Sequence, residues 1–312
     1  MKKLLAALSA ATVFAAPAIA APLVREIAPI GSEPGQVLWL GRQALVSRQG
    51  TGEILIWDQK NLHALTRLEG CRPSGMIATR DRHFLLACTE SPRLLVMNDV
   101  GQVVETFPRP EEERGLVRLA DQAKLDLTGV TSMARDARGG VYVAVTGSDR
   151  PDAGSRGKGR IYYLSPSRSS LTALASNLDY PAGLALSADG KSLFVSEGFS
   201  RQIRRFDAQP GVLSNPSVIA RIPELYQASA SAAEEPWPGA LAFNSKGHLY
   251  IALSGDGRIL VASPEGKRLA MIEMPVPYIQ GFSFSRTDRI MYVTGSRSLA
   301  ATGTGSLYEI RL

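Results

Sequence analysis

Apolar and polar residues alternate over short stretches along most of the chain, and turn residues separate these stretches. The clearest case runs from Tyr180 to Asp207 and reads YPAGLALSADGKSLFVSEGFSRQIRRFD. Two-residue alternation bounded by Gly, Asp and Ser is typical of β-strands joined by tight turns. This segment therefore predicts three successive short strands.

Degenerate copies of the same pattern recur along the chain. They begin at Arg72, Gly129, Pro238 and Gln280 and read RPSGMIATRDRHFLLACTESPRLLVMN, GVTSMARDARGGVYVAV, PGALAFNSKGHLYIALSGDGRILVAS and QGFSFSRTDRIMYVTG. Such repetition is the signature of a β-propeller, in which each blade packs against its neighbours and the blades close into one ring.

The predicted third strand of each repeat starts with a small or polar residue followed by Ile or Leu. The number of such pairs gives the number of blades. The six pairs are Glu53-Ile54, Arg93-Leu94, Arg160-Ile161, Gln202-Ile203, Arg258-Ile259 and Ser306-Leu307. The chain ends at Leu312 with the third strand of the last blade, and Leu23 to Ile30 alternates like an outer strand. We therefore predict an all-β, six-bladed β-propeller over residues 21–312, closed by the N-terminal strand completing the last blade.

The first twenty residues predict a signal peptide. Lys2 and Lys3 precede an apolar run from Leu4 to Ala16, and Ala18-Ile19-Ala20 gives the small-residue pattern before a cleavage site at Ala21. No later run approaches the length needed to span a bilayer as a helix. We expect a periplasmic or secreted protein without a transmembrane segment after signal removal.

Charge and cysteine content add two expectations. Removing Lys2 and Lys3 takes the formal charge from +6 to +4, and the remaining basic residues are scattered over turns. No basic stripe with interleaved aromatics is present, so we expect no nucleic-acid partner. Cys71 and Cys88 are predicted to pair in an oxidising compartment, with two buried thiols as the alternative.

Loop lengths indicate which face of the propeller carries function. Turns such as 189–191 and 244–247 are short, whereas the long connections 109–127, 147–159, 223–238 and 295–305 all fall on the opposite face. Long loops on a rigid scaffold favour binding. Tyr180, Trp237 and Tyr278 precede the inner strands of the last three blades and either wall a small-molecule pocket or cover the strand ends.

The segment PAGLALSADGKSLFVSE, from Pro181 to Glu197, closely resembles the gluconolactonase/regucalcin (senescence marker protein) superfamily of six-bladed, calcium-dependent propellers. The resemblance covers most of the chain after residue 20. It implies a divalent cation in the central channel, held by a Glu before the first inner strand, by Asn residues in later blades and by an Asp in a Pro-Asp-Gly turn. The cation would polarise a lactone carbonyl while a carboxylate helps to activate water.

Only part of that ligand set has a counterpart here. Glu33, ahead of Pro34-Gly35, matches the family's first glutamate, but Ala182 stands at an Asn position and Pro238-Gly239-Ala240 replaces the Pro-Asp-Gly turn. The third-blade Asn position falls at Val130 or Thr131. Calcium takes six to eight oxygen ligands. The cofactor therefore stays unknown, with calcium suggested by the resemblance and opposed by the missing ligands.

Other polar residues near strand ends are candidates for the channel. They are Arg48, Ser74, Glu90, Thr146, Glu197, Gln280 and Thr294. Glu33, Glu90 and Glu197 either form an alternative carboxylate cluster or make salt bridges to arginines and lysines. The three histidines lie away from the channel, and no G-x-S-x-G motif indicates a serine hydrolase.

These observations support three functional hypotheses. The first is a binding propeller that holds a small organic molecule, with Arg48, Ser74, Thr131, Tyr180, Trp237, Tyr278 and Gln280 as ligand-binding candidates. The second is a lactone or ester hydrolase with a rearranged site, in which Glu33 is the metal ligand and catalytic centre and Glu90 or Glu197 assists. The third is an envelope protein-interaction scaffold that uses the loop 147–159.

Overall fold

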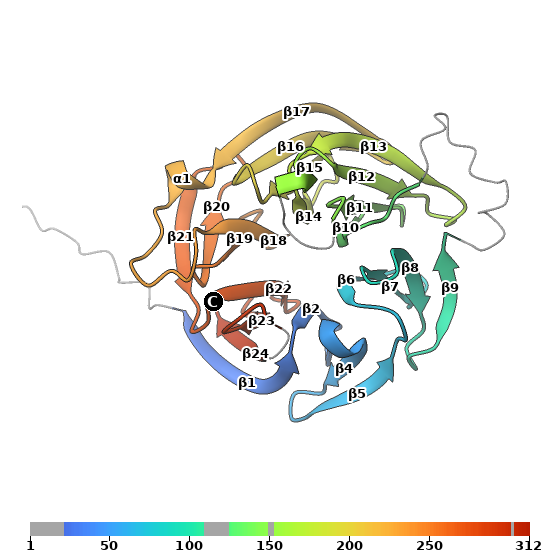
Figure 1. Ribbon diagram of the computed structural model, residues 1–312, viewed down its shortest axis with the longest axis horizontal. Helices are drawn as coiled ribbons and strands as arrows, with labels where there is room; N and C mark the ends of the chain where they lie inside the picture. The colour runs from blue at the N-terminus through green and yellow to red at the C-terminus, as the bar shows by residue number, and fades with distance from the viewer. Residues whose placement is uncertain (1–21, 109–124, 149–152, 301–302) are drawn as a thin grey trace, which may run out of the picture.

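The computed structural model describes residues 22–108, 125–148, 153–300 and 303–312. Within these residues the chain folds into six antiparallel sheets of four strands each. The sheets surround a common axis in chain order, so the predicted six-bladed β-propeller is confirmed (Figure 1). The expected signal peptide, residues 1–20, lies outside the described residues.

Blades 1 to 5 each run from the innermost to the outermost strand in chain order. Blade 1 consists of β2 (Pro34–Trp39), β3 (Ala44–Arg48), β4 (Glu53–Trp57) and β5 (Leu62–Arg67), and blade 2 of β6 (Pro73–Ala78), β7 (Phe84–Cys88), β8 (Arg93–Met97) and β9 (Val103–Phe107). Blade 3 consists of β10 (Val130–Arg135), β11 (Val141–Val145), β12 (Gly159–Leu164) and β13 (Leu171–Leu178), and blade 4 of β14 (Pro181–Leu186), β15 (Ser192–Glu197), β16 (Gln202–Gln209) and β17 (Val212–Arg221). Blade 5 consists of β18 (Trp237–Phe243), β19 (Leu249–Ser254), β20 (Arg258–Ala262) and β21 (Arg268–Glu273).

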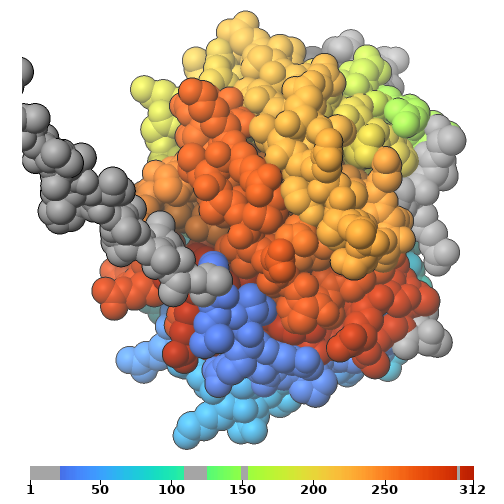
Figure 2. Space-filling model, turned by 90° about the vertical axis from the view of Figure 1, so that its left-hand side faces the viewer, coloured from blue at the N-terminus to red at the C-terminus, as the bar shows by residue number. Residues whose placement is uncertain are grey.

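Blade 6 joins the two ends of the chain, as the sequence predicts. Its inner strands are β22 (Tyr278–Phe284), β23 (Ile290–Ser296) and β24 (Thr304–Arg311), and β1 (Leu23–Ser32) is its outer strand. The β1–β24 register runs from Leu23 opposite Arg311 to Ser32 opposite Thr304. Figure 2 shows the blue N-terminal strand packed into the outer surface beside the orange and red segments of blades 5 and 6.

The core consists of hydrophobic layers between adjacent blades. The second strands β7 and β11 are buried along their whole length, whereas the outer strand β5 has no fully buried residue. One layer joins blades 2 and 3 through side chains such as Leu85, Val141 and Leu164. A middle strand is covered on both faces by neighbouring blades, which explains why its sequence is continuously apolar.

Among the described residues, helical structure is confined to connections. It comprises the short α1 (Ile222–Leu225) and the 3-10 turns Gln49–Thr51 and Ala153–Ser155. Within the described part of the chain, no helix has the length and apolar character needed to cross a membrane.

A β-bulge opens each inner strand and brings adjacent blades into close contact. The registers with the second strands shift at Pro34/Val37, Pro73/Gly75, Val130/Ser132, Pro181/Gly183, Pro238/Leu241 and Ile279/Gly281. A Cβ atom on Gly75 would lie 2.5 Å from the Thr131 carbonyl oxygen, and one on Gly183 would lie 2.3 Å from the Gly239 carbonyl oxygen. Glycine is required at these two positions because the next blade's backbone occupies the space of a side chain.

The bulges lie on the same face as the long connections, which we call the long-loop face. In each sheet the turns between first and second strands and between third and fourth strands lie on the opposite face, which we call the short-turn face. The long-loop face carries the second-to-third and blade-to-blade connections, including 222–236. All of the candidate site residues are at strand ends or turns on this face.

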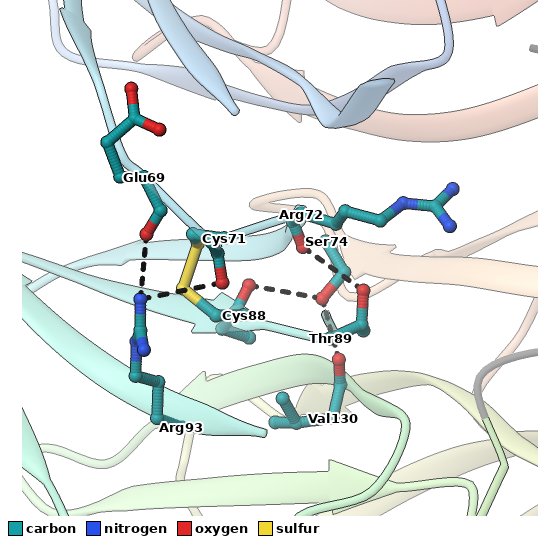
Figure 3. Close-up of a disulfide and its surroundings, with 10 residues drawn as sticks. Glu69, Cys71, Arg72, Ser74, Cys88, Thr89, Arg93 and Val130 are labelled. Atoms are coloured by element: carbon teal, nitrogen blue, oxygen red, sulfur yellow. Dashed lines mark hydrogen bonds between the residues drawn. A yellow bond between two sulfur atoms is a disulfide. The ribbon is translucent and has the colours of Figure 1, made fainter. Parts of the chain in front are cut away.

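The structure contains the predicted disulfide between Cys71 and Cys88, which closes a separation of 17 residues in blade 2 (Figure 3). Both cysteines are buried. Arg93 donates from Nη2 to the carbonyl oxygen of Glu69, 2.9 Å away, just before the bridge. The bridge therefore ties the chain entering β6 to the end of β7.

Candidate functional site

Six equivalent residues, one per blade, stand immediately before the inner-strand bulges and form what we call the entry ring. They are Glu33, Arg72, Gly129, Tyr180, Trp237 and Tyr278. Because the inner strands pack in the order of the blades around the axis, the charged pair lies on one side and the aromatics on the other. The entry ring is therefore amphipathic across its diameter.

Glu33 and Arg72 form the charged side of the entry ring. The Glu33 Oε2 and Arg72 Nη2 atoms are 3.2 Å apart, and the Glu33 side chain is 16% exposed. Glu33 has a left-handed backbone with φ of 48°, and its carboxylate packs over Gly50, whose added Cβ would lie 2.8 Å from Oε2. The backbone around the turn thus aims this carboxylate at the arginine of the next blade.

Tyr180 and Trp237 begin the aromatic side. Their ring centroids are 6.5 Å apart in an edge-on arrangement, and Tyr180 also contacts Phe199 at 5.1 Å. Tyr180 is buried, whereas Trp237 is half-buried. The Arg156 guanidinium lies over the Phe199 ring. The buried Tyr180 therefore supports the aromatic side of the entry ring from beneath, and Trp237 and Phe199 are the more accessible residues of that side.

Tyr278 continues this side on blade 6. Trp237 Nε1 donates a hydrogen bond to Glu234 Oε1 at 3.3 Å. Burial, and secondarily the negative charge of Glu234, raise the pKa of Tyr278 above its ordinary value. Glu234 thus interacts with both aromatics, and the Tyr278 hydroxyl stays protonated and able to donate at neutral pH.

Ser74 and Thr131 use their hydroxyl groups to join blades. Ser74 Oγ donates to the carbonyl oxygen of Val130 at 2.6 Å, and Thr131 Oγ1 donates to that of Pro181 at 3.0 Å. Ser196 and Thr294, on the second strands of blades 4 and 6, also donate to the next blade, at the carbonyl oxygens of Gly239 and Gly35. In every case a hydroxyl of one blade donates to the bulge region of the next blade. Each of these hydroxyl groups is therefore already used in a contact that joins two blades.

The bulge register also fixes the position of Thr131. Val130 pairs with Val145, and Thr131 is the extra residue before the pairing resumes at Ser132. Ala182 is the extra residue of the bulge in blade 4. Thr131 is therefore the counterpart of Ala182, which resolves the choice between Val130 and Thr131.

Glu33, Glu90 and Glu197 do not form a carboxylate cluster. Glu197 is buried, and its Oε2 accepts from Gln202 Nε2 at 2.7 Å and from Arg204 Nε at 2.8 Å. Glu90 is exposed in the β7–β8 turn. Among the described residues, no group of three or more His, Cys, Asp or Glu side chains is arranged to hold a metal ion. The salt-bridge alternative describes Glu33 and Glu197, which have arginine partners.

Arg48 and Gln280 also have local partners. Arg48 Nη1 lies 2.6 Å from Glu53 Oε2. A hydrogen bond from Thr51, opposed by burial and helped by the Arg48 charge, lowers the pKa of Glu53. The Gln280 amide lies 2.9 Å from the Ser296 hydroxyl. Both side chains therefore brace the strand ends around the entry ring.

Comparison with known proteins identifies the family. A family model described as the SMP-30/Gluconolactonase/LRE-like region matches residues 44–297, which is most of the chain. The chain belongs to this gluconolactonase-like family. The resemblance inferred from the segment Pro181 to Glu197 is thereby confirmed.

Curated relatives of this gluconolactonase-like chain include staphylococcal lactonases. Lactonase drp35 of Staphylococcus saprophyticus is 30% identical over 140 residues, covering 45% of this chain and 40% of that protein. The Staphylococcus haemolyticus protein of the same name is 28% identical over 146 residues, covering 47% and 42%. The match thus spans about two fifths of the length of these relatives.

Solved structures share the fold of the gluconolactonase-like chain. A gluconolactonase from Xanthomonas campestris superposes with a TM-score of 0.72 at 17% identity, covering 93% of this chain and 90% of that one. The calcium-binding protein regucalcin from Agrobacterium tumefaciens gives a TM-score of 0.68 at 14% identity, covering 92% and 95%. At these identities the likeness shows the fold alone.

Sequence reasoning missed three residues of this gluconolactonase-like site. Arg72 is the partner of Glu33, and Phe199 and Glu234 complete the aromatic side. The repeat pattern does carry a signal for Arg72, because this residue precedes Pro73 as Glu33 precedes Pro34. Phe199 lies in a turn within the repeat and Glu234 in the long connection before β18, so the strand alternation carries no signal for either.

Proposed function

We propose that this gluconolactonase-like propeller binds a small organic molecule at the entry ring and does so without the divalent metal of its family. The observation that carries the proposal is the amphipathic ring itself, with an ion pair at the entries of blades 1 and 2 and aromatic residues at the entries of blades 4 to 6. Aromatic walls with a few placed polar groups are typical of small-molecule sites. The ligand class that fits is a compact molecule with one flat apolar side and one polar or charged side.

The residues at the family's ligand positions do not fit calcium. Thr131, Ala182 and Gly239 supply no carboxylate or amide oxygen from their side chains, and the Thr131 hydroxyl already donates to Pro181. The Glu33 carboxylate is paired with Arg72. Calcium takes six to eight oxygens, several of them from carboxylates. We therefore derive no chemical step through a metal.

The proposal is tested by metal analysis and thermal shift on the protein from Ala21 onward, purified without chelator. We expect no stoichiometric metal, no stabilisation by calcium, and stabilisation by compounds that combine an aromatic ring with a polar group. Trp237→Ala should remove that stabilisation. Leu269→Ala, which changes an exposed apolar residue on the outer strand of the same blade, should leave it unchanged.

A contrary result is equally clear. If a broad compound set stabilises nothing, or if Trp237→Ala and the unaltered protein respond alike, the entry ring is not a ligand site. Stoichiometric calcium that disappears in Glu33→Ala would replace this proposal with the metal-dependent hydrolase.

A second candidate function is hydrolysis of lactones or esters, which the similarity to the staphylococcal lactonases favours. Glu33 is the carboxylate of the entry ring and would take a proton from the attacking water as general base. Glu33→Gln should then lower the rate of lactone ring opening about 10²- to 10⁴-fold. Glu265→Gln, in an exposed β20–β21 turn on the short-turn face, is the control. Equal rates in the Glu33 variant and the unaltered protein would reject this role.

We also propose that the protein is exported to the periplasm or secreted. The apolar run after Lys2 and Lys3 and the disulfide between two buried cysteines support this proposal, because stable disulfides are typical of oxidising compartments. N-terminal sequencing of the protein recovered outside the cytoplasm should begin at Ala21. A cytoplasmic protein that retains Met1 would contradict it.

A further inference from the structure

A cavity of about 170 Å³ lies on the short-turn face between blades 2 and 3, across the molecule from the entry ring. Its walls are the β6–β7, β10–β11 and β12–β13 turns. Its floor is formed by Leu85, Val141 and Leu164, which belong to the hydrophobic layer between the two blades. The cavity therefore offers an apolar base that is continuous with the core.

Three arginines stand around this floor. Arg80, Arg138 and Arg168 line the cavity, and Asp81 is the one acidic residue among its lining residues. The lining thus carries a formal charge of +2, from three arginines and one aspartate. Cationic groups above an apolar floor favour an organic anion over a neutral or cationic molecule.

Arg168 forms ion pairs with two carboxylates of the protein itself. Its Nη2 lies 2.7 Å from Asp81 Oδ2, and its Nε lies 3.1 Å from Glu105 Oε2. Although burial opposes it, hydrogen bonds from Thr79 and Arg168 hold the pKa of Asp81 well below its ordinary value. Arg168 has a left-handed backbone with φ of 57°, which these two ion pairs help to maintain. The Arg168 side chain is therefore held in place between blades 2 and 3.

Arg80 and Arg138 are differently placed. Arg80 Nη1 donates to the Arg138 carbonyl oxygen at 3.2 Å, which is a neutral acceptor. Among the described residues, neither guanidinium has a carboxylate within 4.0 Å. Gly139, with φ of 97°, lets the Arg80 stem pass close by, since an added Cβ would lie 3.0 Å from Arg80 Cδ. Two arginines that line the cavity therefore have no anionic partner in the described structure.

We infer that this cavity between blades 2 and 3 is a second ligand site, which takes a small organic carboxylate. The carboxylate would bind Arg80 and Arg138 through charge-assisted hydrogen bonds. The hydrocarbon part would lie on Leu85, Val141 and Leu164. Because the cavity is smaller than a typical drug-sized site, a single aromatic ring or a short chain is the expected size. This site is separate from the entry ring and does not depend on the proposed function.

Titration calorimetry with benzoate on the Trp237→Ala protein tests this inference, because an aromatic ring with a polar group is also the ligand class proposed for the entry ring. We expect saturable binding that weakens as ionic strength rises, and no comparable binding of the neutral isostere benzamide. In the same Trp237→Ala background, the double variant Arg80→Gln/Arg138→Gln should weaken benzoate binding about tenfold or more, as expected for the loss of hydrogen bonds to a charged group. Each single variant should bind benzoate with an affinity between those measured with both arginines and with neither.

Two control variants show whether benzoate binds at this cavity or elsewhere on the protein. Arg42→Gln removes an exposed arginine from a β2–β3 turn on the same face of blade 1, and in the Trp237→Ala background it should leave benzoate binding unchanged. The protein with Trp237 intact and Arg80→Gln/Arg138→Gln shows how much benzoate the entry ring binds by itself. Absence of saturable binding, equal binding of benzamide, or full binding by a folded double variant would overturn the inference.

Discussion

The buried Glu197 carboxylate forms an ion pair with Arg204, which is near in space and in sequence. The residue is 1% exposed, and Arg204 Nε donates to its Oε2 while the Asp179 backbone N–H donates to Oε1 at 3.0 Å. A buried carboxylate is stable only when its hydrogen bonds and counter-charge are complete. Glu197 therefore holds the strand ends of blade 4 together on the long-loop face.

Replacement of Arg204 tests this role directly. Arg204→Met leaves the Glu197 carboxylate buried without its cation and should lower the free energy of unfolding by about 3 kcal/mol. Arg205→Met is the matched control, because Arg205 makes only a surface ion pair with Asp207, with 3.6 Å between charged atoms. That variant should lose less than about 1 kcal/mol. Urea unfolding of both variants measures the difference, and equal losses would contradict the buried-pair role.

At the scale of the element, the inner strand depends on its bulge. The bulge turns one carbonyl toward the preceding blade, where a hydroxyl such as Ser74 or Ser196 donates to it. Gly75 and Gly183 make room for the same approach. Blade-to-blade contact near the axis is thus a backbone contact, fixed by small residues and not by large apolar side chains.

Replacement by alanine is expected to affect stability differently at two inner-strand glycines. Gly183→Ala places a Cβ 2.3 Å from the Gly239 carbonyl oxygen, so the backbone must shift, and we expect a loss of about 1–3 kcal/mol. Gly239→Ala meets its nearest atoms only at 3.9 Å and should change stability by less than about 1 kcal/mol. Thermal and urea unfolding compare the two. A tolerated Gly183→Ala would show that the blades are not in rigid contact there.

The disulfide acts within a single blade. It links the chain before β6 to the end of β7 over a separation of 17 residues. Restricting an unfolded loop of this length contributes about 3 kcal/mol in the chain-entropy model. We expect Cys71→Ala/Cys88→Ala to lose about that much stability by urea unfolding. Dithiothreitol should destabilise the unaltered protein and leave the double variant unchanged, and an equal response of both would argue against the bridge.

On the scale of the whole molecule, closure of the ring depends on β1. Its pairing with β24 covers the edge that blade 6 would otherwise expose, and it links the two ends of the chain in one sheet. An uncovered strand edge is a template for pairing with another chain. The N-terminal strand therefore contributes to stability and also protects the ring from edge-to-edge association.

Truncation tests closure. A chain beginning at Glu33 lacks β1 and should unfold at lower urea than one beginning at Ala21, and it should associate in a concentration-dependent way through the exposed β24 edge. Light scattering after size-exclusion chromatography measures the association. If the shorter chain is as stable as the longer one and associates no more, β1 is dispensable for closure.

Blade number, strand order, closure by the N-terminal strand and the cysteine pair all followed from the sequence. Blade number and strand order depend on two-residue alternation and on turn chemistry, which act between residues that are neighbours in the chain. The contacts of several polar side chains did not follow, because their partners lie on other blades. Glu33 meets Arg72 and Arg168 meets Glu105 only after the blades pack. The tertiary structure alone decided that the carboxylates are separated, that Thr131 corresponds to Ala182, and that arginines surround an apolar cavity between blades 2 and 3.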